Sequence, residues 1–312
     1  MGDKSLLKFC VETGNCNLWD KNDRKVLRSC GVEEIFIGHW FMGSDYSREK
    51  VKDLRKVLEE DGLYVKSSHP PFGSYNQPFS TLRQSLAGLK KEVEWMKEYI
   101  LRCGLLGIPA IPLHTGGAML PAAKEWEIES TRAYVNALLP AAEEAGVVIA
   151  IENTNHALPI VFYPQMEEQA ELNLNIWDFD DTQKMLDFVH GFNSEFIRIC
   201  YDTGHSHLLG RMLEDLDAFY DDIVLFHLHD NDGVGDDAHI QPGYGNSDWY
   251  TLFEKVGKYE KTPILYVEAP AFFKDQALMM KELNAIAQQK VIVKDGGFLK
   301  KDENTGRILI LP

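Results

Sequence analysis

Short apolar runs alternate with longer amphipathic segments along most of the chain. Eight runs have the length and apolar content of buried strands: 6–12, 34–37, 63–66, 108–113, 147–151, 197–201, 223–226 and 263–267. In the segments between them, apolar residues recur three and four positions apart, which is helical spacing. These predicted helices cover residues 20–29, 47–61, 80–103, 129–145 and 274–289, and another begins at Asp181. Residues 156–176 are a long, helix-poor insertion.

This alternation predicts an α/β fold, a (β/α)8 TIM barrel. An open, doubly wound sheet is the main alternative, and such sheets usually carry a Gly-rich phosphate turn after the first strand. The residues from Val11 to Asn15 do not supply the GxGxxG pattern, so the barrel is favoured. We expect the barrel to occupy residues 1–290 and a C-terminal β-hairpin-like extension to occupy 291–312.

The composition allows a large core and argues against several kinds of partner. The chain has 312 residues, 45% of them hydrophobic, and a formal net charge of −16. This charge disfavours a broad surface for nucleic acid or anionic membrane. No apolar run approaches the ~20 residues that cross a bilayer, and no signal-peptide core precedes the first strand. The five cysteines are an odd number without a CxxC pair, which favours free thiols and a cytoplasmic location.

Four successive predicted strands end in a side chain that can bind a divalent cation. These residues are Glu152, Asp202, His227 and Glu268. The carboxyl ends of barrel strands build the active site. Carboxylates with one neutral imidazole can hold a metal ion and leave positions open for substrate. One such residue alone is more often an ordinary loop residue, but four coincident strand ends favour a site.

The sequences at these strand ends resemble motifs of the xylose isomerase-like barrel superfamily, which includes sugar phosphate isomerases, ketose 3-epimerases and endonuclease IV. The matching stretches are IENT at 151–154, DTGH at 202–205, HLHDN at 227–231 and VEA at 267–269, within a resemblance that covers residues 6–290. It implies that Glu152, Asp202, His227 and Glu268 bind one divalent metal ion (Mn, Mg, Co or Zn), with no organic cofactor. His227 is preferred to His229 because it heads the HxxD spacing.

The resemblance also implies a sugar isomerase or epimerase that transfers a proton through a metal-bound enediolate. Glu152 and Glu268 are the candidates to remove and return the proton next to the carbonyl. The expected ligand is a small-molecule sugar, and the expected assembly is a homo-oligomer or a complex with a small partner subunit. The candidate substrate-binding residues are His205, His69, His114, His239, Trp40 and Trp19. For the two earlier histidines and the two tryptophans, a purely structural role is the alternative.

Three other functions are compatible with the same motifs. A lyase that acts on 3-oxo-glycosides, the catalytic subunit of a C-glycoside deglycosidase, would use the same site together with a small partner. Residues 156–176 and the tail could contact that partner, form an oligomer surface or act as a lid. His156 stands where some epimerases carry an acidic substrate contact, and this departure weakens the case for ketose 3-epimerisation in particular.

An endonuclease IV-like abasic-site phosphodiesterase would bind three zinc ions. The residues in matching places are His69, His114, His205, Asp237 and His239. However, residues 241–249 are more similar to the PGxG…DW loop of sugar isomerases, and the acidity of the chain argues against a DNA substrate. A non-catalytic sugar-binding barrel is the third possibility, disfavoured because a binder needs no opposed carboxylates.

Overall fold

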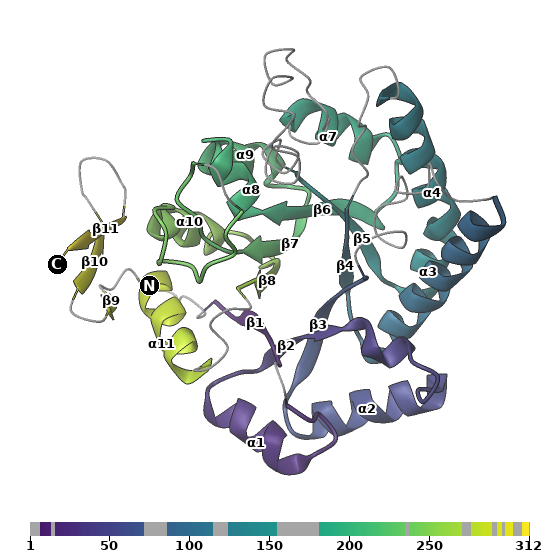
Figure 1. Cartoon of the computed structure of the whole chain (residues 1–312), viewed down its shortest axis with the longest axis horizontal. Helices are drawn as coiled ribbons and strands as arrows, with labels where there is room; N and C mark the ends of the chain where they lie inside the picture. Colours follow the sequence, from purple (N-terminus) through teal and green to yellow (C-terminus); the bar gives the residue numbers. More distant parts are fainter. Residues whose placement is uncertain are drawn as a thin grey trace, which may run out of the picture.

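Eight parallel strands form a nearly closed barrel with helices around it (Figure 1). The computed structural model describes residues 7–13, 16–71, 86–114, 124–154, 181–234, 237–269, 276–288, 292–294, 297–301 and 308–311. The barrel strands are β1 (Phe9–Glu12), β2 (Glu34–Gly38), β3 (Tyr64–His69), β4 (Ala110–Leu113), β5 (Val148–Glu152), β6 (Ile197–Asp202), β7 (Ile223–Leu228) and β8 (Ile264–Val267). They pair in the order β3-β2-β1-β8-β7-β6-β5-β4, and β3 lies beside β4. The predicted (β/α)8 TIM barrel is confirmed.

The helices of the described residues lie on the outside of the barrel (Figure 1). They are α1 (Lys21–Ser29), α2 (Arg48–Glu60), α3 (Leu86–Leu106), α4 (Lys124–Ala145), α7 (Thr182–His190), α8 (Thr203–Leu208), α9 (Met212–Phe219), α10 (Trp249–Val256) and α11 (Gln276–Ala287), with a 3-10 turn, η1 (His39–Met42). The sequence pattern did not indicate α8, α9 or α10. These helices have only six to eight residues, too few for a clear helical period. The insertion at 156–176 lies outside the described residues.

The inside of the barrel is filled by one apolar layer. Its members are Cys10, Phe36, Ala150, Cys200, Leu225 and Tyr266. Side chains two positions apart on a strand face the same side. The residues two positions beyond five of these therefore also face the barrel axis, one step nearer the carboxyl ends: Glu12, Glu152, Asp202, His227 and Glu268. The apolar layer thus lies beneath a second layer, of polar side chains, which we call the polar chamber.

A larger apolar cluster joins the outer faces of the strands to the helices. All five cysteines are free thiols, as predicted, and Cys10 and Cys200 are fully buried. Within the described residues, no helix is long and apolar enough to cross a membrane.

The C-terminal extension is a small antiparallel sheet beside α11 (Figure 1). Its strands are β9 (Ile292–Lys294), β10 (Gly297–Lys301) and β11 (Ile308–Leu311), in the order β11-β10-β9. The predicted hairpin corresponds to β10 and β11, and β9 adds a third strand. The limit at residue 290 between barrel and extension stays a prediction.

Candidate metal centre

The four predicted ligands lie together at the carboxyl ends of β5, β6, β7 and β8. Glu152 and Asp202 are the last residues of their strands, His227 lies within β7, and Glu268 follows β8 directly. Glu152 is 1% exposed, and Asp202 and His227 are 0% exposed. Such burial of charged groups is costly unless they are paired or bind a metal ion.

The three carboxylates converge on one nitrogen of His227. Its Nδ1 lies 2.9 Å from Oε2 of Glu268, 3.4 Å from Oε2 of Glu152 and 3.9 Å from Oδ2 of Asp202. Both ring nitrogens of His227 and Oε2 of Glu152 are buried. Within the described residues, none of these atoms makes a contact with the geometry of a hydrogen bond. Buried polar atoms without such partners are rare in native proteins. Oxygen and imidazole donors of this kind fit a divalent cation.

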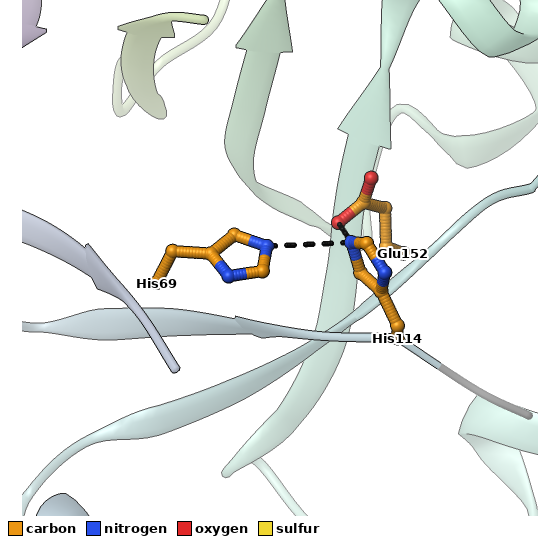
Figure 2. Close-up of side chains that lie close together, drawn as sticks. All are labelled: His69, His114 and Glu152. Atoms are coloured by element: carbon orange, nitrogen blue, oxygen red, sulfur yellow. Dashed lines mark hydrogen bonds and ion pairs between the residues drawn. The ribbon is translucent and has the colours of Figure 1, made fainter. Parts of the chain in front are cut away.

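A second set of donors lies on the β3–β5 side of the chamber (Figure 2). His69 ends β3, His114 follows β4, and Glu152 ends β5. Nε2 of His114 lies 2.9 Å from Oε2 of Glu152 and 3.3 Å from Nε2 of His69. Donor atoms of these three residues all lie within 4.8 Å of one another, close enough to share a metal ion. The structure therefore brings His114 into contact with a predicted metal ligand and His69 into contact with His114.

A third set surrounds Asp237 and contains the other two predicted substrate-binding histidines. Oδ2 of Asp237 lies 3.2 Å from Nε2 of both His205 and His239. The ring of His239 stacks on that of His229, with centroids 3.9 Å apart. Nε2 of His229 lies 3.0 Å from each carboxylate oxygen of Asp202. His229 therefore orients Asp202, whereas His227 faces all three predicted carboxylate ligands; the preference for His227 as a metal ligand stays a prediction.

The charges in the chamber shift one another's pKa values. Burial raises the pKa of Glu268, but His227 beside it outweighs burial and lowers it to about 2. Burial likewise opposes ionisation of Glu152, yet His114 and His227 hold its pKa well below the usual value. Both carboxyl groups are therefore ionised at neutral pH. They are available as metal ligands or as bases.

The histidines divide into two kinds by pKa. Burial, together with His114, lowers the pKa of His69 to about 4, so this imidazole is neutral. Burial also lowers the pKa of His239, but Asp237 and Glu268 outweigh it and raise the pKa to about 9. The pKa of His205 is raised well above its usual value because Asp202 and Asp237 outweigh its burial. Cations in the Asp237 set balance part of the acidic charge.

Asn153 and Gly204 position Asp202. Oδ1 of Asn153 accepts a hydrogen bond from the Asp202 N–H, and its Nδ2 donates to the Asp202 carbonyl oxygen and to Oγ of Ser206. The Asp202 carboxylate also accepts from the N–H of His205, which caps the start of α8. Gly204 has no side chain, and the ring of His229 fills the adjacent space. The IENT and DTGH motifs thus form one hydrogen-bonded support.

Asp230 fastens the loop that carries Asp237 and His239. Its buried carboxylate accepts hydrogen bonds from backbone N–H groups and from Nε1 of Trp249, at 2.7 Å. The backbone donors are Asn231, Gly243, Gly245 and Ser247. A Cβ atom on Gly245 would collide with Asp230 and with the Asn231 carbonyl oxygen. Residues of the PGxG…DW pattern therefore surround one carboxylate and hold the loop around it.

Glu12 is a further acidic residue at a strand end that was not predicted as part of the site. It ends β1, is partly exposed, and accepts a hydrogen bond of 3.1 Å from the Tyr266 hydroxyl. The pairing of Val11 with Val267 places Glu12 next to Glu268. The signal that could have found it is the same as for the other ligands, an acidic residue at a strand end.

The tryptophans belong to an aromatic cluster after β1 and β2. Nε1 of Trp19 donates to the Tyr46 hydroxyl at 3.2 Å, and the Trp40 ring lies edge-on to Tyr46 at 5.2 Å. Trp40 is 39% exposed. Substrate binding by Trp19 and Trp40 stays a prediction. His156 lies outside the described residues.

The fold and this cluster define an α/β barrel with a candidate metal centre at the carboxyl ends of its strands. The sequence profile described as xylose isomerase-like TIM barrel matches residues 24–289. The chain therefore belongs to the xylose isomerase-like TIM barrel family.

Several solved structures share the fold over almost their whole length. A D-tagatose 3-epimerase-like protein has a TM-score of 0.68 and 18% identity, over 91% of this chain and 97% of its own. A xylose isomerase domain protein from Planctomyces limnophilus has a TM-score of 0.66 and 16% identity, over 92% and 99%. The 3-keto-D-glucoside 4-epimerase YcjR from E. coli has a TM-score of 0.60 and 14% identity, over 88% and 100%. At these identities the similarity shows the fold.

One curated relative matches in part. The uncharacterized protein y4fM of Sinorhizobium fredii is 33% identical over 81 residues. The match spans only 25% of that relative's length and 25% of this chain.

Proposed function

We propose that the chain is a divalent-metal-dependent sugar isomerase or epimerase. The observation that carries the proposal is that the carboxylates of Glu152, Asp202 and Glu268 converge on Nδ1 of His227. None of these close contacts to Nδ1 has the geometry of a hydrogen bond. These four residues would hold one ion of Mn, Mg, Co or Zn. When bound, such an ion polarises a carbonyl oxygen and stabilises the negative charge that develops on it.

Glu152 and Glu268 have the chemistry and placement for proton transfer. They approach Nδ1 of His227 from β5 and β8, with β6 and β7 between those strands. Both pKa values are depressed, so both groups can accept a proton at neutral pH. One carboxylate can remove a proton from one face of a carbon next to a carbonyl. The other carboxylate can then return a proton to the opposite face of the same carbon or to the neighbouring carbon. The products would be an epimer or an isomer.

Other histidines suit substrate contacts. His69 is neutral, which lets one ring nitrogen donate and the other accept a hydrogen bond. His114 and His205 approach Glu152, and His239 lies beside Glu268. These side chains surround the two candidate bases, as expected for groups that hold sugar hydroxyls.

A lyase on 3-oxo-glycosides would use the same residues. The similarity in fold to the E. coli 3-keto-D-glucoside 4-epimerase, whose name contains a 3-keto sugar, favours including such compounds. After deprotonation next to the carbonyl, the glycosidic bond would break, and the leaving group would take the electron pair. Product analysis distinguishes this outcome from epimerisation.

A second candidate function is endonuclease IV-like hydrolysis of abasic DNA. The observation that favours it is the presence of two further donor sets beside the central one, His69–His114–Glu152 and His229–Asp237–His239. Three donor sets are compatible with three metal ions.

Metal content per chain is the deciding measurement, made on protein purified without chelator. About one Mn, Mg, Co or Zn per chain, followed by turnover of a ketose or 3-oxo-glucoside, is the expected result. Close to three zinc ions with cleavage of an abasic duplex would favour the second candidate. Protein that contains no metal and takes none up on titration would overturn both.

A further inference from the structure

A tight turn at residues 241–244 lies in the loop that carries His239. The N–H of Tyr244 donates to the Gln241 carbonyl oxygen at 3.0 Å, and Gly243 has a φ of 90°. Proline in the second position and glycine with a positive φ in the third are typical of a type II turn. The turn therefore brings its first and last residues, Gln241 and Tyr244, close together.

Both of these side chains donate to one carboxylate on an outer helix. Nε2 of Gln241 lies 2.7 Å from Oε2 of Glu282, and the Tyr244 hydroxyl lies 3.2 Å from its Oε1 and 3.1 Å from its Oε2. Glu282 belongs to α11, which packs against α10 on the outside of the barrel (Figure 1). Glu282 and Gln241 are both buried. Because a buried carboxylate needs hydrogen-bond donors, these contacts hold the turn against α11.

The residue two positions before the turn has an uncommon backbone conformation. His239 has a φ of 45°, in the left-handed region that residues other than glycine seldom adopt. Such a conformation persists only where the surrounding structure holds the chain in place. Directly after His239, Ile240 exchanges two backbone hydrogen bonds with Asp230, at 2.7 Å and 3.1 Å. The next residue, Gln241, is fixed by Glu282, so the chain after His239 has two anchors.

The anchored backbone fixes the place of the His239 ring. This ring stacks on His229 with an interplanar angle of 6°. Its Nε2 lies 3.2 Å from Oδ2 of Asp237, and its Nδ1 lies 3.2 Å from the Glu268 carbonyl oxygen. Relaxation of φ out of the left-handed region would redirect the Cα–Cβ bond and move the ring away from these groups.

We infer that Glu282 is a positioning residue of the candidate site, although it lies on an outer helix. It acts through Gln241 and Tyr244, whose turn holds His239 in its left-handed conformation. The inference deepens the proposed function and rests on it, because His239 is there a substrate contact.

Four variants test the anchor. Glu282→Gln keeps the size of the side chain but turns amide hydrogens toward the donors of Gln241 and Tyr244. The double variant Glu282→Gln/Gln241→Glu exchanges the two partners and again places a donor opposite an acceptor. Tyr244→Phe removes a single donor and should have a smaller effect. The control is Lys281→Gln, at the exposed neighbouring position of α11. Circular dichroism verifies that each variant is folded.

The position of the His239 ring is measured without substrate, by NMR of isotope-labelled histidine in the Mg(II)-loaded protein. Stacking on His229 shifts the ring protons of His239 upfield, and their signal is identified by its loss in His239→Gln. We expect Glu282→Gln to move this signal toward that of an unstacked imidazole and the double variant to restore it. Lys281→Gln should leave it in place. An unmoved signal in Glu282→Gln, or a displaced one that the exchange of partners does not restore, would overturn the inference.

Turnover of a ketohexose by the Mn(II)-loaded protein supplies a second readout. Glu282→Gln should raise KM about tenfold and change kcat less than about twofold, because the misplaced ring weakens binding of the substrate and of the transition state alike. The double variant should recover most of the KM. A lowered kcat at constant KM would contradict this role. A wild-type protein that turns over no ketose or 3-oxo-glucoside would overturn the proposed function, whereas the NMR signal still decides whether Glu282 positions His239.

Discussion

A Cβ atom on Gly204 would lie 2.6 Å from Nε2 of His229 and closer still to its Cε1. The imidazole that occupies this space contacts both carboxylate oxygens of Asp202. Gly204 therefore permits the contact that orients a predicted metal ligand.

We expect Gly204→Ala to lower both stability and metal affinity. Because the ring of His229 must move, the cost in the free energy of unfolding should be ~1–3 kcal/mol, as for other overpacked cores. Denaturant unfolding and metal titration measure the two effects. The double variant Gly204→Ala/His229→Ala removes the collision and should recover part of the lost stability. A double variant that shows simple additivity would contradict the contact.

Glu152→Gln and Glu268→Gln should each reduce kcat by about a hundredfold or more, since a positioned acid or base contributes about 10² to 10⁴ to the rate. Folding should be largely retained, because glutamine keeps the size of the side chain. Circular dichroism and metal content are measured alongside turnover. Glu260→Gln, at an exposed position before β8, is the matched control and should leave kcat unchanged. Wild-type turnover in either site variant would remove that residue from the proton-transfer step.

The stability of the metal-free protein should fall as the pH rises above neutrality. Asp237 raises the pKa of His239 to about 9 and contributes to the raised pKa of His205. A histidine whose pKa is raised in the folded state stabilises the fold fully below its unfolded pKa of about 6.5. This stabilisation is lost as the pH rises through the folded pKa of about 9. Thermal unfolding of chelator-treated protein between pH 6 and pH 10 measures this loss.

Asp237→Asn should flatten that pH dependence, because it removes the shared carboxylate. His190→Gln is the control: His190 lies 2.8 Å from Asp222 in a separate, exposed pair. Its slope should match the wild type. At acidic pH the carboxylate of Glu268 has the opposite effect, because its pKa is lowered to about 2. Its ionisation stabilises the fold fully above a pH of about 4.5, and this stabilisation is lost as the pH falls through about 2.

Asp230→Asn should loosen the loop at 231–247. One acceptor oxygen would become an amide donor facing N–H groups, and a buried hydrogen bond to a charged group is worth ~1.5–3 kcal/mol. We expect a loss of about that size in stability and weaker substrate binding, because this loop carries the candidate substrate contact His239. Asp232→Asn, which changes an exposed aspartate of the same loop whose Oδ1 accepts from the N–H of Val234, should cost under ~0.5 kcal/mol.

The sequence was sufficient for the barrel and for placing the four candidate ligands at its strand ends, because both depend on local patterns. Glu152, Asp202 and Glu268 directly follow apolar runs, and period-two alternation then decides which way they face. The contact between His229 and Asp202 and the place of Glu12 in the site were not predicted, for different reasons. The role of His229 depends on a contact with Asp202, 27 positions earlier in the chain. Glu12 was passed over because a single acidic residue after a strand is common.

Short helices and supporting contacts are also not evident from the sequence. The helix α8 begins immediately after Asp202, within the DTGH motif, and its six residues are too few for a clear helical period. Spacing gives no role to Asp230, and only the fold shows that its carboxylate accepts hydrogen bonds from N–H groups as far away as Trp249. Such roles require the three-dimensional path of the loop, which spacing alone does not specify.

The barrel is a circle of eight strands in which backbone pairing ends at β3 and β4. At that seam, within the described residues, Oγ of Ser67 donates to the Ala110 carbonyl oxygen at 3.4 Å, and His69 meets His114 directly. An ion held by these two histidines would therefore link β3 to β4 and stabilise the closed barrel. Binding of the ion and closure of the barrel would then be coupled. Removal of the ion should let the amide hydrogens of β3 and β4 exchange with solvent before those of β6 and β7.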